Sequence, residues 1–209
     1  NGHSSDDPVI CKARSLPFPR IKPGDLIVHP RTDTRYAVSK MADETLGLIY
    51  QHTYGLPVRI GRLFNTVGPR QSAAYGMVLP RFVEQALAGR KLTIHGNGMQ
   101  TRCFIHVLDT VEAILALCNT TTTQGQIYNI GNETETTIWF LAKTVLERIG
   151  RDHEKNRFEF FHHEEVYGSK FEDMPRRVPD ISKIKAATRW TPKRSLVEII
   201  DSTIAERRA

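Results

Sequence analysis

The sequence is poor in cysteine and has no long apolar run. Its 209 residues include three cysteines, Cys11, Cys103 and Cys118. An odd, scattered set excludes a disulfide framework and a zinc ribbon, and it indicates a reducing compartment. No apolar stretch approaches the roughly 20 residues of a membrane span, and the polar segment 1–14 has no signal-peptide core. We therefore expect a cytoplasmic protein without membrane contact.

Basic clusters are also missing, although the chain is basic. Lys and Arg number 29 against 23 Asp and Glu, which gives a formal charge of +6. Basic residues distributed in this way along the chain are typical of a generally basic surface, or of a protein in which a few arginines hold an anionic ligand. Without a helix-turn-helix, zinc or RNP pattern, nucleic acid is not an expected partner.

From Tyr36 onward, helical patterns alternate with short apolar strands. This alternation predicts the α/β class. Gly55 and Gly150 are expected to end helices, Asp109 to be a helix N-cap, and Ser195 to open a capping box. The predicted helices cover 36–54, 79–87, a segment after 109, 137–149, 180–188 and a segment from 195, and the predicted strands cover 58–64, 92–94, 126–130 and 158–161.

The first segment with a chemical signature is Tyr36 to Lys40. At this i, i+4 spacing the two side chains share one face of a helix. A nearby ammonium favours the phenolate and lowers the tyrosine pKa, so Tyr36 could act as a general base on a hydroxyl. The alternative is a surface tyrosine beside a solvated lysine.

Four segments together carry a family resemblance: YAVSKMADE (36–44), PVRIGRLFNTVGPR (57–70), LTIHGNGMQTRCFIHVLD (92–109) and DMPRRVPD (173–180). In this order and spacing they resemble the extended short-chain dehydrogenase/reductase family, in particular its nucleotide-sugar epimerase/dehydratase branch. The resemblance implies the C-terminal part of a doubly wound, NAD(P)-binding Rossmann-like fold with a smaller α/β substrate domain. Residues 1–75 would be the remainder of the Rossmann-like domain, and 76–209 mostly the substrate domain.

The resemblance also implies roles for individual residues. Tyr36 would be the catalytic acid/base at the sugar 4-hydroxyl, and Lys40 would hold the nicotinamide ribose of NAD. Leu63 and Phe64 would border the nicotinamide. The residues implied for a UDP- or dTDP-sugar are Asn65, Met77, Val78, Thr93, His95, Arg102, Arg177 and Asp180.

Within that substrate set, the resemblance places Thr93 and His95 beside the nucleobase. Arg102 and Arg177 would clamp the diphosphate, because guanidinium forks match phosphate oxygens. Each residue also has a structural alternative: a surface salt bridge for an arginine, packing at a strand edge for His95, and a turn for Asn65.

The sequence departs from the family pattern in two ways. A G-x-G-x-x-G fingerprint is missing, and residues 96–101 are only a near miss, so we expect the C-terminal part of an epimerase-like protein. Counting back from Tyr36 without gaps places the family's catalytic hydroxyl on Asp6, with Ser5 adjacent as the candidate, and its acidic residue on Pro8. This count favours a 4-epimerase over a dehydratase or decarboxylase.

Several functions therefore remain open. The leading prediction is a 4-epimerase-like enzyme, incomplete as a catalyst without an N-terminal half, which forms a homodimer through the helices that begin near Tyr36 and Leu79. The alternatives are a UDP-glucuronate decarboxylase, a dTDP-glucose 4,6-dehydratase, and a catalytically silent binding or dimerisation module. No metal is expected, because the adjacent His162 and His163 do not share a helix face.

Overall fold

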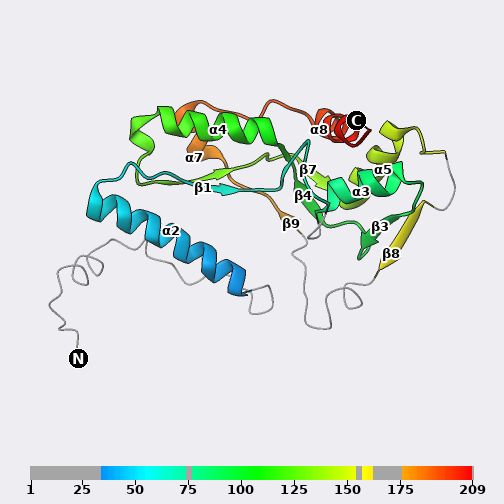
Figure 1. The fold of residues 1–209 in the computed structure, drawn as a ribbon, viewed down its shortest axis with the longest axis horizontal. Helices are drawn as coiled ribbons and strands as arrows, with labels where there is room; N and C mark the ends of the chain where they lie inside the picture. The colour runs from blue at the N-terminus through cyan, green and yellow to red at the C-terminus, as the bar shows by residue number, and fades with distance from the viewer. Residues whose placement is uncertain (1–33, 74–76, 154–156, 162–175, 209) are drawn as a thin grey trace. The chain divides into compact units, whose positions relative to one another are not determined.

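The computed structural model describes residues 34–73, 77–153, 157–161 and 176–208 (Figure 1). Its contacts divide the chain into two compact units, residues 1–58 and residues 59–209.

The described part of the first unit is dominated by one helix, α2 (Thr34–Tyr54). It confirms the helix predicted over 36–54. The helix ends where Gly55 adopts a φ of 67° and its amide donates to the carbonyl of Gln51 at 2.9 Å, because glycine adopts the left-handed conformation of a helix end without steric cost.

Short parallel strand pairs form the framework of the second unit. β1 (Ile60–Leu63) pairs with β6 (Ile127–Ile130), β2 (Thr66–Val67) with β5 (Ile105–His106), and β3 (Leu92–His95) with β8 (Phe158–Phe161), all in parallel. β4 (Thr101–Cys103) lies between antiparallel β7 (Glu135–Thr137) and parallel β9 (Arg176–Arg177). Because helices connect parallel strands, the predicted α/β class is confirmed.

Five α-helices and one 3₁₀ turn join the described strands of the second unit. They are α3 (Val78–Leu87), α4 (Val107–Asn119), η1 (Thr121–Thr123), α5 (Ile138–Ile149), α7 (Ser182–Thr188) and α8 (Leu196–Arg208). The predicted end of α5 is confirmed, since Gly150 has a φ of 81°. At its start the Thr137 hydroxyl accepts from the amide of Phe140 at 3.0 Å. Ser195 and Glu198 form the predicted capping box at α8, with a 2.7 Å bond from the Ser195 amide to the carboxylate.

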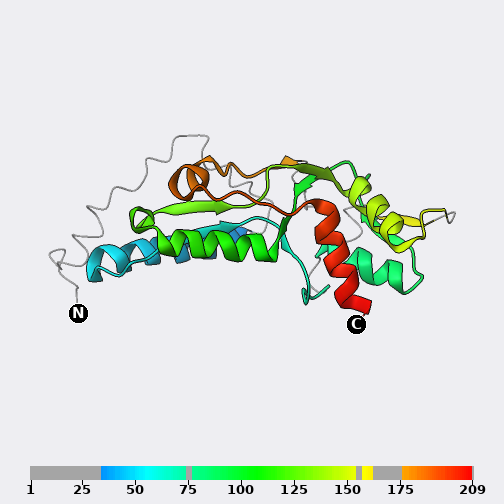
Figure 2. The ribbon, with the colours of Figure 1, turned by 90° about the horizontal axis from the view of Figure 1, so that it is seen from above.

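The apolar side chains of the second unit gather in two clusters. In the larger one α3, α5 and α8 pack against one another around fully buried residues such as Phe82, Leu141 and Ile200. The smaller one joins α4, α7 and β6 through Leu117, Ile184 and neighbours. Figure 2 shows the two helix groups at opposite ends of this unit. The strands between them position the candidate site.

Helix α4 begins three residues earlier than predicted. Its N-cap is His106, whose Nδ1 accepts from the amide of Leu108 at 3.1 Å. Nε2 of His106 then donates to Ser202 at 3.1 Å, because a ring nitrogen that accepts leaves the proton on the other. Asp109, predicted as the cap, lies inside the first turn.

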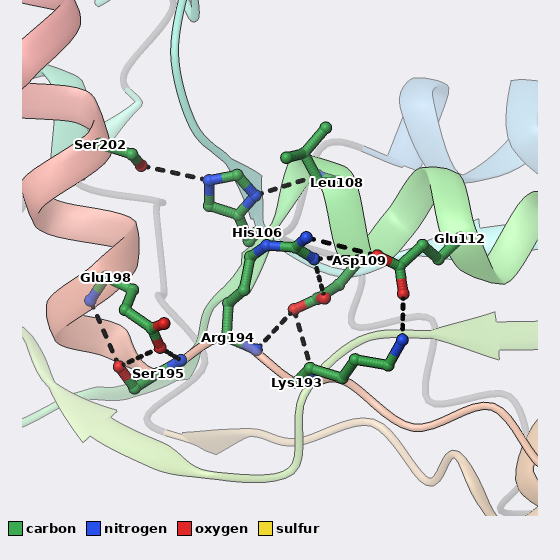
Figure 3. Close-up of polar contacts among 9 residues, drawn as sticks. All are labelled: His106, Leu108, Asp109, Glu112, Lys193, Arg194, Ser195, Glu198 and Ser202. Atoms are coloured by element: carbon green, nitrogen blue, oxygen red, sulfur yellow. Dashed lines mark hydrogen bonds and ion pairs between the residues drawn. The ribbon is translucent and has the colours of Figure 1, made fainter.

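Asp109 is instead the centre of a buried polar network (Figure 3). Its carboxylate is fully buried and accepts from the Arg194 guanidinium and from the amides of Arg194 at 3.0 Å and Lys193 at 3.3 Å. Glu112 completes the network with a 2.8 Å ion pair to the Lys193 ammonium, which lowers the pKa of Glu112. A short acidic residue at a helix start thus anchors a distant loop.

Candidate functional site

The two arginines predicted to hold a diphosphate lie directly opposite each other. Arg102 in β4 is the Cα partner of Arg177 in β9, in parallel register. Paired residues of neighbouring strands point to the same face of a sheet. The Nη1 of Arg102 donates to the carbonyl of Thr101 at 2.8 Å. The register therefore places the two arginines opposite each other on one face of the sheet, an arrangement suited to binding an anion between them.

The opposite face of this small sheet carries an ion pair. Arg176 donates to Glu135 through Nη2 at 2.6 Å and through Nε at 3.1 Å. The Thr101 hydroxyl donates to the same carboxylate at 2.9 Å. The hydrogen bond from Arg176, followed by that from Thr101, lowers the pKa of Glu135, so this carboxylate stays ionised.

Thr93 and His95, predicted beside the nucleobase, lie on β3, whose second edge is covered by side chains. The Gln85 amide oxygen accepts from the amide of Thr93 at 3.1 Å, and the Gln85 amide nitrogen donates to the Thr93 hydroxyl at 2.9 Å. Arg81 donates to the Thr93 carbonyl at 3.2 Å, and Gln100 donates to the His95 carbonyl at 2.8 Å. His95 therefore lies at a strand edge that neighbouring side chains cover, as the structural alternative for this residue predicts.

Arg81 and Gln85 are residues that the sequence analysis missed. They stand one helical turn apart on α3, and this i, i+4 spacing was the signal that they share a face. The Nη1 of Arg81 lies 3.4 Å from Nε2 of His95, so that nitrogen accepts and the ring proton is on Nδ1. A cavity of about 470 Å³ adjoins them, and it is lined by Ser72, Ala73, Arg81, Glu84, Gln85 and Arg90.

Leu63, Phe64 and Asn65 follow one another at the carboxyl end of β1. The Phe64 amide continues the ladder to the carbonyl of Ile130 at 3.0 Å. Asn65 has a φ of 37°, and its side-chain amide donates to the carbonyl of Cys103 at 2.9 Å. Asn65 therefore stabilises the turn, which is the structural role given above as the alternative to substrate binding. The carboxyl edge of parallel strands is also where α/β proteins bind ligands, which fits the predicted nicotinamide contact.

Gly131 brings this edge close to the segment that contains Arg177 and Asp180. A Cβ at Gly131 would lie 2.8 Å from Cγ of Pro179 and 3.0 Å from Cβ of Phe64. Only a residue without a side chain permits this approach. Gly131 therefore lies in close contact with Phe64 and with Pro179, which follows strand β9.

The remaining predicted substrate residues have local structural contacts. Met77 is the exposed N-cap residue of α3, and Val78 packs against the larger cluster. Asp180 accepts from the amide of Ser182 at 2.8 Å, and hydrogen bonds from Ser182 lower the Asp180 pKa. The Asp180 carbonyl accepts from Asn129 at 2.9 Å. Their substrate roles stay predictions.

The glycine-rich near miss at 96–101 is a turn between β3 and β4 that presents carbonyls. The carbonyl of Gly98 accepts from the amide of Trp139 at 2.8 Å, and that of Gln100 accepts from Ile138 at 3.1 Å. These carbonyls accept hydrogen bonds from the first amides of α5, so those amides are not available to bind a phosphate. This turn is therefore not a phosphate loop.

Part of the predicted catalytic set lies outside the described residues. Ser5, Asp6, Pro8 and the segment 162–165 fall there. Tyr36 is in helix α2, one turn before Lys40, whose ammonium pairs with Asp43 at 3.0 Å. Among the described residues, no helix is long and apolar enough to cross a membrane, and no group of three or more potential metal ligands occurs. The catalytic roles of Tyr36, Lys40 and Ser5 stay predictions.

Parallel strand pairs with intervening helices, which bind ligands at the carboxyl ends of the strands, are typical of Rossmann-like nucleotide-binding proteins. The family model of GDP-mannose 4,6 dehydratase matches residues 27–203. The chain belongs to this family, which confirms the resemblance to nucleotide-sugar epimerases and dehydratases of the short-chain dehydrogenase/reductase type.

Two similar curated proteins are decarboxylases. The chain is 39% identical over 170 residues to a UDP-N-acetyl-alpha-D-glucosaminuronate decarboxylase of Bacillus cytotoxicus, covering 81% of this chain and 51% of that protein. It is 38% identical over 187 residues to UDP-glucuronic acid decarboxylase 6 of Arabidopsis thaliana, covering 84% and 51%. The chain thus spans about half the length of these relatives.

Two similar solved structures contain NAD. A UDP-glucuronic acid 4-epimerase of Bacillus cereus, in complex with UDP-glucuronic acid and NAD, has a TM-score of 0.72 at 26% identity, covering 83% of this chain and 52% of that one. A dTDP-glucose 4,6-dehydratase of Bacillus anthracis, in complex with NAD, has a TM-score of 0.71 at 27% identity, covering 83% and 51%. They confirm the predicted Rossmann-like fold.

Proposed function

We propose that this chain is the substrate-binding part of an NAD-dependent decarboxylase that acts on a UDP-linked hexuronic acid. The observation that carries the proposal is the identity of 39% and 38% to two decarboxylases of UDP-uronic acids. The paired Arg102 and Arg177 supply the charge that a diphosphate needs.

This proposal replaces 4-epimerisation as the leading function. The epimerase prediction depended on an ungapped count that placed the catalytic hydroxyl on Asp6 and the acidic residue on Pro8. Both positions lie outside the described residues, and the count crosses a proline-rich stretch. The similarity to decarboxylases extends over most of the chain and is therefore the stronger guide.

The proposed chemistry follows from the position of the carboxylate. Tyr36 takes the proton of the sugar 4-hydroxyl, and Lys40 favours the phenolate that accepts it. When bound, NAD would supply the acceptor for the C4 hydride and the donor for the final reduction at C4. The 4-ketone is β to the C5 carboxylate, so the C–CO₂ bond breaks as its electrons delocalise toward the ketone oxygen. Proton addition at C5 and reduction at C4 then give a UDP-pentose and CO₂.

A chimera tests the proposal. The N-terminal half of the Bacillus cytotoxicus relative is joined to this chain, and the product is incubated with NAD and UDP-glucuronic acid. Mass spectrometry should detect loss of CO₂. Loss of water would indicate a dehydratase, and an isomer of unchanged mass would indicate an epimerase. Tyr36→Phe should lower turnover by about two or more orders of magnitude, through loss of acid/base catalysis.

The predicted homodimer is also part of the proposal, with one change. The apolar residues of α3, such as Leu79 and Phe82, are buried within their own unit, so α3 offers little apolar surface to a partner. Helix α2 exposes Val38, Leu46 and Tyr50. We therefore expect α2 to supply the apolar contacts, and Leu46→Glu should shift the mass measured by light scattering from dimer to monomer.

A further inference from the structure

Strand β9 is held in place by little backbone pairing. It contains only Arg176 and Arg177, and both are exposed. Two-residue strands are marginal by themselves. Arg177 also lies directly opposite Arg102, and like charges in that position destabilise a strand pair. Something other than the strand itself must keep β9 in register.

The described contacts point to Glu135 on the far strand of the same sheet. Successive residues alternate between faces, so Arg176 and Arg177 point in opposite directions. While Arg177 joins Arg102 on one face, Arg176 reaches across β4 to Glu135 on the other, in a forked ion pair of 2.6 to 3.1 Å. Thr101, in β4 between them, donates to the same carboxylate at 2.9 Å.

We propose that Glu135 is a positioning residue for the anion site. Through Arg176 it fixes the register of β9 and so keeps the Arg177 guanidinium beside that of Arg102, ready for a nucleoside diphosphate. Glu135 acts through the sheet and does not touch the ligand. This inference rests on the proposed function, because it takes the arginine pair as the diphosphate site.

Because Glu135 is negatively charged, a positioning role and a simple electrostatic effect predict opposite changes in anion binding when the carboxylate is removed. If this carboxylate were only a negative charge near the site, its removal would strengthen binding of an anion. If it fixes β9, its removal weakens binding. Solvent-exposed ion pairs also contribute little to the stability of a fold, so the variant should remain folded.

Titration calorimetry on the 209-residue chain tests this, with UDP and uridine as ligands. Glu135→Gln should weaken UDP binding by about tenfold, equivalent to about 1.4 kcal/mol, and leave uridine binding unchanged, because uridine has no phosphate. The matched control is Asp201→Asn, which removes a similar forked pair with Arg148, at 2.7 and 2.8 Å, between helices α5 and α8 rather than between strands of the sheet. It should change neither affinity.

A charge exchange completes the test. Glu135→Arg combined with Arg176→Glu rebuilds the ion pair in reverse and should recover most of the UDP affinity. UDP binding by Glu135→Gln that equals or exceeds that of the wild type would overturn the inference while the proposed function stands. An equal loss of uridine binding would also overturn it. A wild-type chain that binds no UDP would refute the diphosphate site and the inference with it.

Discussion

Asp109→Asn is the substitution that tests the buried network most directly. Asparagine keeps the shape and one acceptor oxygen, but it removes the charge that faces Arg194. The carboxylate is fully buried, and it accepts from one guanidinium and two backbone amides. Breaking one side of a buried ion pair costs about 3–5 kcal/mol of unfolding free energy.

Two features of the structure reduce that figure. The side chain of Arg194 is 28% exposed, and it also contacts Glu112 at 3.3 Å, so water and a second carboxylate compensate part of the loss. We expect a decrease of about 2–3 kcal/mol. For a protein of this size the melting temperature should fall by roughly 5–10 °C.

Urea and thermal unfolding, followed by circular dichroism, measure this change. Asp201→Asn removes an exposed carboxylate from a forked pair with Arg148 and should cost less than about 1 kcal/mol. If the two variants were equally mild, Asp109 would not be a buried anchor. A double-mutant cycle with Arg194→Met should return a coupling energy, because the two side chains contact each other.

Three further outcomes follow from the described contacts. Burial, and then the charge of Arg194, lower the pKa of His106 below its usual 6.5. The unfolded chain therefore binds more protons, so the unfolding free energy should fall as the pH drops below 6.5. In urea titrations at several pH values, His106→Asn, which keeps a helix-capping side chain, should reduce this fall. Gly131→Ala should lower the unfolding free energy by about 1–3 kcal/mol, because the new Cβ would lie 2.8 Å from Pro179; no loss in a thermal melt would contradict the close approach. Cys103 is buried and burial raises its pKa to about 11, whereas Cys118 is exposed. Peptide mapping after iodoacetamide should find Cys118 modified before Cys103, and equal rates for these two in the native protein would refute the burial of Cys103.

The parts of the fold that the sequence could predict are those fixed by neighbouring residues. Gly55 ends α2, Gly150 ends α5, and Ser195 with Glu198 opens α8, because caps depend on residues within one turn. The longer strands were predictable for the same reason. Here local pattern and tertiary structure agree.

The parts that could not be predicted depend on contacts between distant residues. Strands β4 and β9 are too short for a periodic pattern, so the register that places Arg102 beside Arg177 has no local signal. Asp109 has the sequence appearance of a cap, and only the return of Arg194 from far along the chain makes it a buried anchor. The family resemblance named both arginines, but it did not indicate Glu135, whose carboxylate pairs with Arg176 beside Arg177 on β9.

The covered edge of β3 has a consequence for how the protein behaves in concentrated solution. An unpaired strand edge is a template on which another chain can add, and this is a common origin of aggregation. Arg81 and Gln85 occupy the amide and carbonyl of Thr93 on that edge, and Gln100 occupies the carbonyl of His95. A foreign strand would have to displace three side chains before it could form a ladder there, so this sheet cannot readily grow at its β3 edge.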